Sequence, residues 1–131
     1  MTVLDASALI AFLDPTDALH GRAIASLKAR GRRRLGVSPV THAELLVGPT
    51  RAGTLAATQD ALAALGVAEI SLPCDAAPRL ATLRANTQLK LPDCCVILTA
   101  QQCAGTILTF DNRLASVARK LALGVEELAV P

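Results

Sequence analysis

The sequence predicts an α/β fold in which a parallel β-sheet of about five strands lies between helices. Short apolar runs of strand length alternate with longer segments whose apolar residues recur at helical spacing. The two clearest runs, Val3-Leu4 and Thr106–Thr109, each lead to an acidic residue and then to a helical pattern. Ligands of open parallel sheets bind outside the carboxyl ends of the strands. Acidic residues at those ends are therefore candidates for a functional site.

Five segments are interpreted as strands from their apolar residues and from the turn residues around them. The segment after Gly31 is bounded by Ser38-Pro39, and a weaker one ends before Pro73. The last candidate follows Gly124 and would form an edge strand. In order, the expected strands are 3–4, 35–37, 69–72, 106–109 and 125–130.

The helices are placed by their capping signals. Thr16 or Asp17 can cap the second helix, Ser38-Pro39 supplies an N-cap followed by proline at the first position of the third, and Asp75 can cap the fifth. The third helix is expected to stop near Gly48-Pro49. In order, the expected helices are 6–13, 18–29, 39–48, 54–65, 76–87, 93–104 and 113–123.

Composition limits the classes of function. With 131 residues the chain has the size of one domain, which we assign to residues 1–131, and 52% hydrophobic residues argue against disorder. Aromatic residues make up only 2%, so the stacking platforms of many single-strand binders are missing. No signal peptide or membrane span is recognised, which predicts a cytoplasmic protein without membrane contact. The four cysteines form no C-x-x-C pair and are interpreted as free thiols.

A short basic run lies between the second helix and the second strand. One interpretation is a solvated charge cluster, and the other is a surface that contacts RNA phosphates. The run comprises Lys28, Arg30, Arg32, Arg33 and Arg34.

Four acidic residues fall where helices begin or strands end, namely Asp5, Glu44, Asp93 and Asp111. Each has a structural explanation: an N-cap for the first and last, a capping box with Thr41 for Glu44, and a dipole interaction for Asp93. Converging carboxylates repel one another, however, and a hard divalent cation such as Mg²⁺ or Mn²⁺ relieves that repulsion. Such an ion can activate a water for phosphodiester hydrolysis.

The order of these acids resembles that of PIN-domain ribonucleases, and the whole chain resembles the VapC-type toxins of bacterial toxin–antitoxin pairs. The match departs slightly at Cys94, where the family often has alanine. In order, the matching motifs are Val3-Leu4-Asp5-Ala6-Ser7-Ala8-Leu9-Ile10, Ala43-Glu44-Leu45, Pro92-Asp93-Cys94-Cys95-Val96-Ile97 and Thr109-Phe110-Asp111.

The resemblance implies a metal-dependent endoribonuclease in which the four acids hold one or two Mg²⁺ or Mn²⁺ ions. Ser7 and Thr109 would support the acids or the attacking water, and either Asp111 or Asn112 would face the metal. It also implies a homodimer and an antitoxin partner. We expect that partner to insert a cation among the acids and to lie in an apolar groove around Ile24, Leu27, Leu45 and Leu46.

The same acids allow three alternatives: a receiver-type phospho-acceptor, a dehalogenase-type phosphatase and a non-catalytic PIN-like module. A receiver-type phospho-acceptor needs a second acid beside Asp5 and a lysine after the last functional strand, but Ala6 and Phe110 stand there. A dehalogenase-type phosphatase would carry Asp where Ser7 stands. A non-catalytic PIN-like module that only binds a protein partner remains the alternative, and retention of all four acids argues against it.

Overall fold

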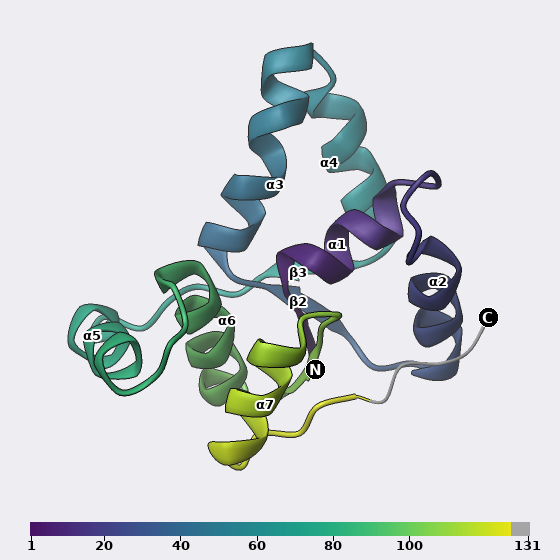
Figure 1. Cartoon of the computed structure of the whole chain (residues 1–131). Helices are drawn as coiled ribbons and strands as arrows, with labels where there is room; N and C mark the ends of the chain where they lie inside the picture. Colours follow the sequence, from purple (N-terminus) through teal and green to yellow (C-terminus); the bar gives the residue numbers. More distant parts are fainter. Residues whose placement is uncertain (127–131) are drawn as a thin grey trace.

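Four short parallel strands form one sheet in the order β3-β2-β1-β4 (Figure 1). The structure, a computed structural model, describes residues 1–126. Thr2 pairs with Leu35 on one side and with Thr106 on the other, so β1 is central. The strands are β1 (Thr2–Leu4), β2 (Leu35–Val37), β3 (Val67–Glu69) and β4 (Thr106–Leu108). This confirms the predicted α/β class with a parallel sheet.

Seven helices occur within the described residues, and they connect and cover the strands (Figure 1). In the part of the chain up to residue 126, no helix has the length and hydropathy of a membrane span. The helices are α1 (Ala6–Leu13), α2 (His20–Ala29), α3 (Pro39–Ala52), α4 (Leu55–Ala64), α5 (Ala76–Asn86), α6 (Leu91–Gln102) and α7 (Asn112–Lys120).

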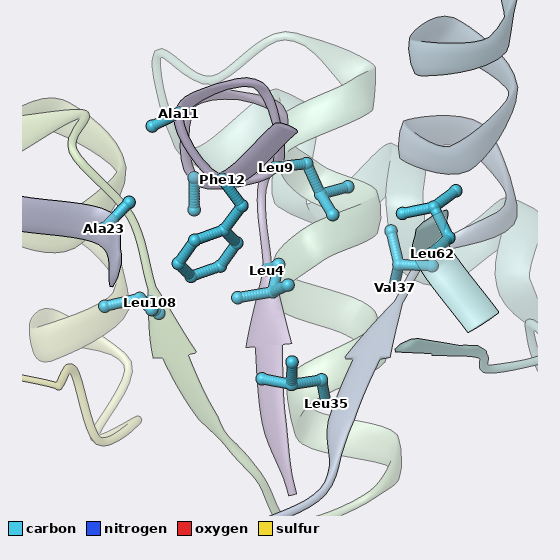
Figure 2. Packing of buried hydrophobic residues seen from close by; sticks show 10 residues of the cluster. Leu4, Leu9, Ala11, Phe12, Ala23, Leu35, Val37, Leu62 and Leu108 are labelled. Atoms are coloured by element: carbon cyan, nitrogen blue, oxygen red, sulfur yellow. The ribbon is translucent and has the colours of Figure 1, made fainter. Parts of the chain in front are cut away.

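One face of the sheet packs against α1, α2 and α4. Figure 2 shows Phe12 of α1 directed toward Leu4 of β1 and Leu108 of β4, with Ala23 of α2 beside them. Leu62 of α4 covers the β2 side. Burial of these aliphatic side chains is the main source of stability in a chain that contains only 2% aromatic residues.

The opposite face packs against α6 and α7. Val3 and Ile107 point to this side because successive strand residues alternate between faces. Ile97 of α6 and Leu114 of α7 are fully buried against them. Both faces of the sheet are therefore covered by helices, so a ligand can approach the sheet at the ends of its strands.

Several predicted boundaries were wrong. Helix α3 continues through Gly48-Pro49, because one proline near a helix end removes only one hydrogen bond, and it ends at Gly53, whose φ of 74° is left-handed. Strand β3 covers Val67–Glu69 instead of 69–72, since its pairing with β2 fixes its position. Helix α7 ends at Lys120, before the expected Gly124.

The predicted last strand is only partly described. Val125 makes an isolated parallel bridge with Ile107, at the β4 edge of the sheet. Residues 127–130 of the expected 125–130 strand lie outside the described residues, with residue 126 the last that the structure describes.

Candidate active site

Asp5 is the buried acid at the carboxyl end of the central strand. It follows β1 directly and caps α1, where its Oδ1 accepts the backbone N–H of Ala8 at 3.0 Å. The same oxygen accepts the Ser7 hydroxyl at 2.7 Å, and Oδ2 accepts the Thr109 hydroxyl at 2.5 Å. Only 3% of the residue is exposed. Its side chain is thus held by three donors, and Oδ2 keeps one lone pair free for another partner.

Ser7 and Thr109 link the ends of β1 and β4. Their oxygens lie 3.4 Å apart, and the proton of each hydroxyl is directed at Asp5. In return, Ser7 Oγ accepts the N–H of Phe110 at 3.0 Å and Thr109 Oγ1 accepts the N–H of Asp111 at 2.9 Å. Each hydroxyl therefore donates to Asp5 and accepts one backbone N–H, which makes both of them supports for Asp5 and for the ends of the two strands.

Asp111 leaves the end of β4 and caps α7. Its Oδ1 accepts the backbone N–H groups of Arg113 at 2.9 Å and Leu114 at 3.2 Å, so its other oxygen can face the site. Asn112 is the first residue of α7 and is exposed. Of these two candidates, Asp111 has the contacts that fix it beside Asp5.

Asp93 and Glu44 come from helices on either side of these strand ends. Asp93 lies in the first turn of α6, where the helix dipole favours a negative charge, and it is half-buried. Glu44 is exposed on α3, whose N-cap is Ser38 rather than Thr41. Within residues 1–126, neither carboxylate has a hydrogen bond or an ion pair.

Burial and the negative charges of neighbouring acids raise the pKa values of Asp5 and Asp93. Burial, followed by the negative charges of Asp111, Asp5 and Glu44, raises the pKa of Asp93, which Lys90 lowers to a smaller degree. Burial also raises the pKa of Asp5, against the effect of its hydrogen bonds, and Asp111 adds to the rise. All four predicted acids thus share one electrostatic environment, which a cation would stabilise.

The four carboxylates are ligands of the kind that a hard cation prefers, although they do not lie close enough together to surround one. Carboxylate oxygens are ligands that suit Mg²⁺ or Mn²⁺, and Asp93, Glu44 and Asp111 each have an oxygen that accepts no hydrogen bond within residues 1–126. In the described part of the chain, no three Asp, Glu, His or Cys side chains are grouped closely enough to hold a metal ion. Because Mg²⁺ commonly keeps several waters and binds through one or two carboxylates, the residues fit an ion held partly through water.

A cleft of about 480 Å³ opens beside the acids and carries cations that the sequence analysis missed. Asp93 and Asp111 line it, as do Gln88, Lys90 and Arg113. Lys90 and Arg113 stand within three residues of a predicted acid. That proximity was a usable signal for positive charge beside the site.

The basic run is separated from the acids. Arg34 precedes β2, and its carbonyl accepts the N–H of Thr2, at the amino end of the sheet. Each strand residue adds about 3.3 Å, so Arg34 lies at the opposite end of the strands from Asp5. Arg33 pairs with Glu126 at 3.5 Å, while Lys28 and Arg32 are exposed.

The four residues expected to form the apolar groove for the partner are only partly exposed. Ile24, Leu27, Leu45 and Leu46 are partly buried and pack against the core on the α1 side of the sheet. Of these, Leu46 lines a shallow cleft of about 430 Å³ on α3 and α4, which also contains the exposed Val47.

A family model identifies the family of this chain. The family model described as PIN domain matches residues 2–120. The comparison with curated protein sequences gives no match.

Three solved structures illustrate the structural similarity. A toxin–antitoxin complex from Klebsiella pneumoniae has a TM-score of 0.73 and 25% identity, covering 89% of this chain and 92% of that one. VapC20 from Mycobacterium tuberculosis, a toxin that cleaves the sarcin–ricin loop, has a TM-score of 0.77 and 15% identity, with 98% and 100% coverage. VapBC2 from Rickettsia felis, bound to a promoter DNA fragment, has a TM-score of 0.72 and 14% identity, with 98% of each chain covered.

Proposed function

Because this chain belongs to the PIN domain family, we propose that residues 1–131 form one nuclease domain that acts as the endoribonuclease toxin of a cytoplasmic toxin–antitoxin pair. The observation that supports it most is the mutual electrostatic effect of Asp93, Asp111, Asp5 and Glu44 at the carboxyl end of the sheet. Similarity to toxin structures that match over nearly the whole chain supports the same assignment.

Asp5, Glu44, Asp93 and Asp111 would hold Mg²⁺ or Mn²⁺, directly or through water. The bound ion would supply an activated water and charge stabilisation for in-line attack on phosphorus. Asp5 has a fixed orientation because Ser7, Ala8 and Thr109 donate to it. Asp93 is half-buried beside the cleft, where it can accept a proton from water, since its pKa is raised above that of an exposed aspartate.

The first prediction is that Asp93→Asn abolishes cleavage while the fold is kept, because charge is lost at nearly constant shape. Loss of a metal ligand should lower activity by about a hundredfold or more, since even outer partners of metal ligands contribute ten- to a hundredfold. The assay maps cleavage of total cellular RNA with excess Mg²⁺ and with a chelator.

Asp60→Asn is the matched control, because Asp60 is an exposed acid on α4, away from the site. It should cleave at the parental rate. A chelator-insensitive parent protein, or full activity in Asp93→Asn, would refute the metal-site assignment. An inactive parent that still binds its antitoxin would favour the non-catalytic alternative.

We also propose an antitoxin partner that places Arg or Lys among the four acids. A guanidinium matches carboxylates through two parallel hydrogen bonds, and Glu44 and Asp93 have free oxygens for it. The partner would also cover the exposed apolar surface at Val47 on α3. A homodimer would set two such sites in one assembly.

The second prediction is that Mn²⁺ weakens this complex by competing for the acids. Titration calorimetry should give a lower affinity as Mn²⁺ rises, and almost no dependence when the inserted cation is replaced by alanine. Full ribonuclease activity in the saturated complex would contradict this mechanism of inhibition.

A further inference from the structure

A second cleft continues from the acidic site along α7. Its volume is about 520 Å³, and it shares Gln88 and Arg113 with the cleft that contains Asp93 and Asp111. The shared residues make the two clefts neighbours. A chain that enters at the acids can therefore extend into the second cleft without crossing the sheet.

One wall of this second cleft is a single face of α7. Arg113, Ser116, Val117 and Lys120 recur at helical spacing and so point the same way. The apolar part comes from Val117 and from Leu121, which is 39% exposed. Arg113 and Lys120 are exposed, and neither has an ion pair within residues 1–126.

The other wall is the connection between α5 and α6, and it is held in place. Thr87 Oγ1 donates to the carbonyl of Leu83 at 2.7 Å and accepts the N–H of Leu89 at 3.2 Å. Arg84 donates to the Leu89 carbonyl at 2.9 Å, and the Leu89 side chain is buried. Asn86 and Gln88 on this fixed segment are exposed and line the cleft with their amide groups.

The chemistry of the cleft selects an anion that also has an apolar, hydrogen-bonding part. Its lining contains two cations and no carboxylate. Val117 and Leu121 make part of the α7 wall apolar, and the amides of Asn86 and Gln88 can each donate and accept hydrogen bonds. An unpaired nucleotide has these properties, because its phosphates carry charge and its base offers a flat face and a polar edge.

Resting on the proposed ribonuclease function, we propose that this cleft binds one unpaired nucleotide of the RNA beside the cleaved linkage. Arg113 and Lys120 would contact its flanking phosphates, Val117 and Leu121 would support the base, and Gln88 would contact the edge of the base. Aliphatic support fits a chain that lacks Trp and Tyr. The cleft would thus contribute to the choice of cleavage site.

The test measures binding of a short unstructured fluorescent RNA to metal-free protein, so that binding is separated from cleavage. Arg113→Ala with Lys120→Ala should weaken binding about tenfold at low salt and lower the salt slope by about 1.4, since each single-strand phosphate contact contributes about 0.7. Gln88→Ala should keep the slope and change the preference among RNAs that differ at one base.

Arg51→Ala with Arg119→Ala is the matched control, because it removes the same charge from two exposed positions that line neither of the two clefts. Equal losses in both double variants, or a loss in the control alone, would overturn the proposal. So would an α7 double variant that keeps its RNA affinity and instead loses affinity for the antitoxin. RNA binding with the expected slope but no cleavage would refute the nuclease function and leave the nucleotide site standing.

Discussion

At the scale of single residues, the Thr109 hydroxyl connects two strand ends and two acids. It donates to Asp5 at 2.5 Å and accepts the N–H of Asp111 at 2.9 Å, and the residue is buried. Removing it leaves a buried carboxylate oxygen and a backbone N–H without their partners. The Thr109 hydroxyl therefore holds both the Asp5 carboxylate of the site and the backbone that follows β4.

The third prediction follows from this contact. Thr109→Val should lower the free energy of unfolding by about 1–3 kcal/mol, the cost of leaving buried polar groups unpaired. Urea unfolding measures the change. Thr99→Val is the matched control, because the buried Thr99 hydroxyl has no hydrogen-bond partner, and its loss should be neutral or stabilising. Equal destabilisation of both variants would contradict the assigned role of Thr109.

Residue chemistry also explains which parts of the site could be predicted. The sequence allows Asp5 and Asp111 to be either helix caps or site residues, and their contacts show that both are caps. Ligands of a parallel sheet bind outside the carboxyl ends of its strands, and a helix cap at such an end lies at the same place. The two interpretations are therefore compatible. The cations Lys90 and Arg113 were missed because single charges carry no periodic signal.

At the scale of elements, helix α3 shows why boundaries were harder to predict than element types. Gly48-Pro49 has the composition of a helix end, yet the hydrogen bonds that close the helix are made by Gly53 and Thr54 to the Pro49 carbonyl. Strand β3 was displaced for a similar reason, since its limits depend on pairing with β2. Local residue preferences do not contain that tertiary information.

The fourth prediction tests the observed end of α3. Gly53→Ala should destabilise the protein by about 1 kcal/mol, because the left-handed conformation is strained for alanine. Gly48→Ala should stabilise it by up to about 1 kcal/mol, since Gly48 is helical and a Cβ there meets no atom within 4 Å. Thermal melting of both variants gives the signs. A destabilised Gly48→Ala together with an unchanged or stabilised Gly53→Ala would place the helix end at Gly48.

At the scale of the whole molecule, the acids make stability depend on pH. The pKa values of Asp5 and Asp93 are raised in the folded protein, so above the ordinary value of 3.8 the folded state binds more protons than the unfolded state. Their contribution to the free energy of unfolding therefore falls as pH rises through the folded pKa values.

The fifth prediction is that Mg²⁺ or Mn²⁺ raises the melting temperature more at about pH 7 than at about pH 5, where part of the repulsion is already relieved by protons. Melting curves with chelator and with added metal test it. Asp93→Asn should melt higher than the parent protein in chelator and should lose most of the response to metal. An equal metal response at both pH values would contradict it.

The three hydrogen bonds that Asp5 accepts also bear on how a cell can escape this protein. Under the proposed toxin function, cells that lose the antitoxin survive only if mutation silences the toxin. Most changes at Asp5 leave the donors from Ser7, Ala8 and Thr109 unpaired and should therefore lower the amount of folded protein. Glu44 is exposed and has no such bonds within residues 1–126, so a change there leaves the protein intact. Survivors that still make a silent toxin, able to occupy newly made antitoxin, therefore arise at Glu44 more readily than at Asp5.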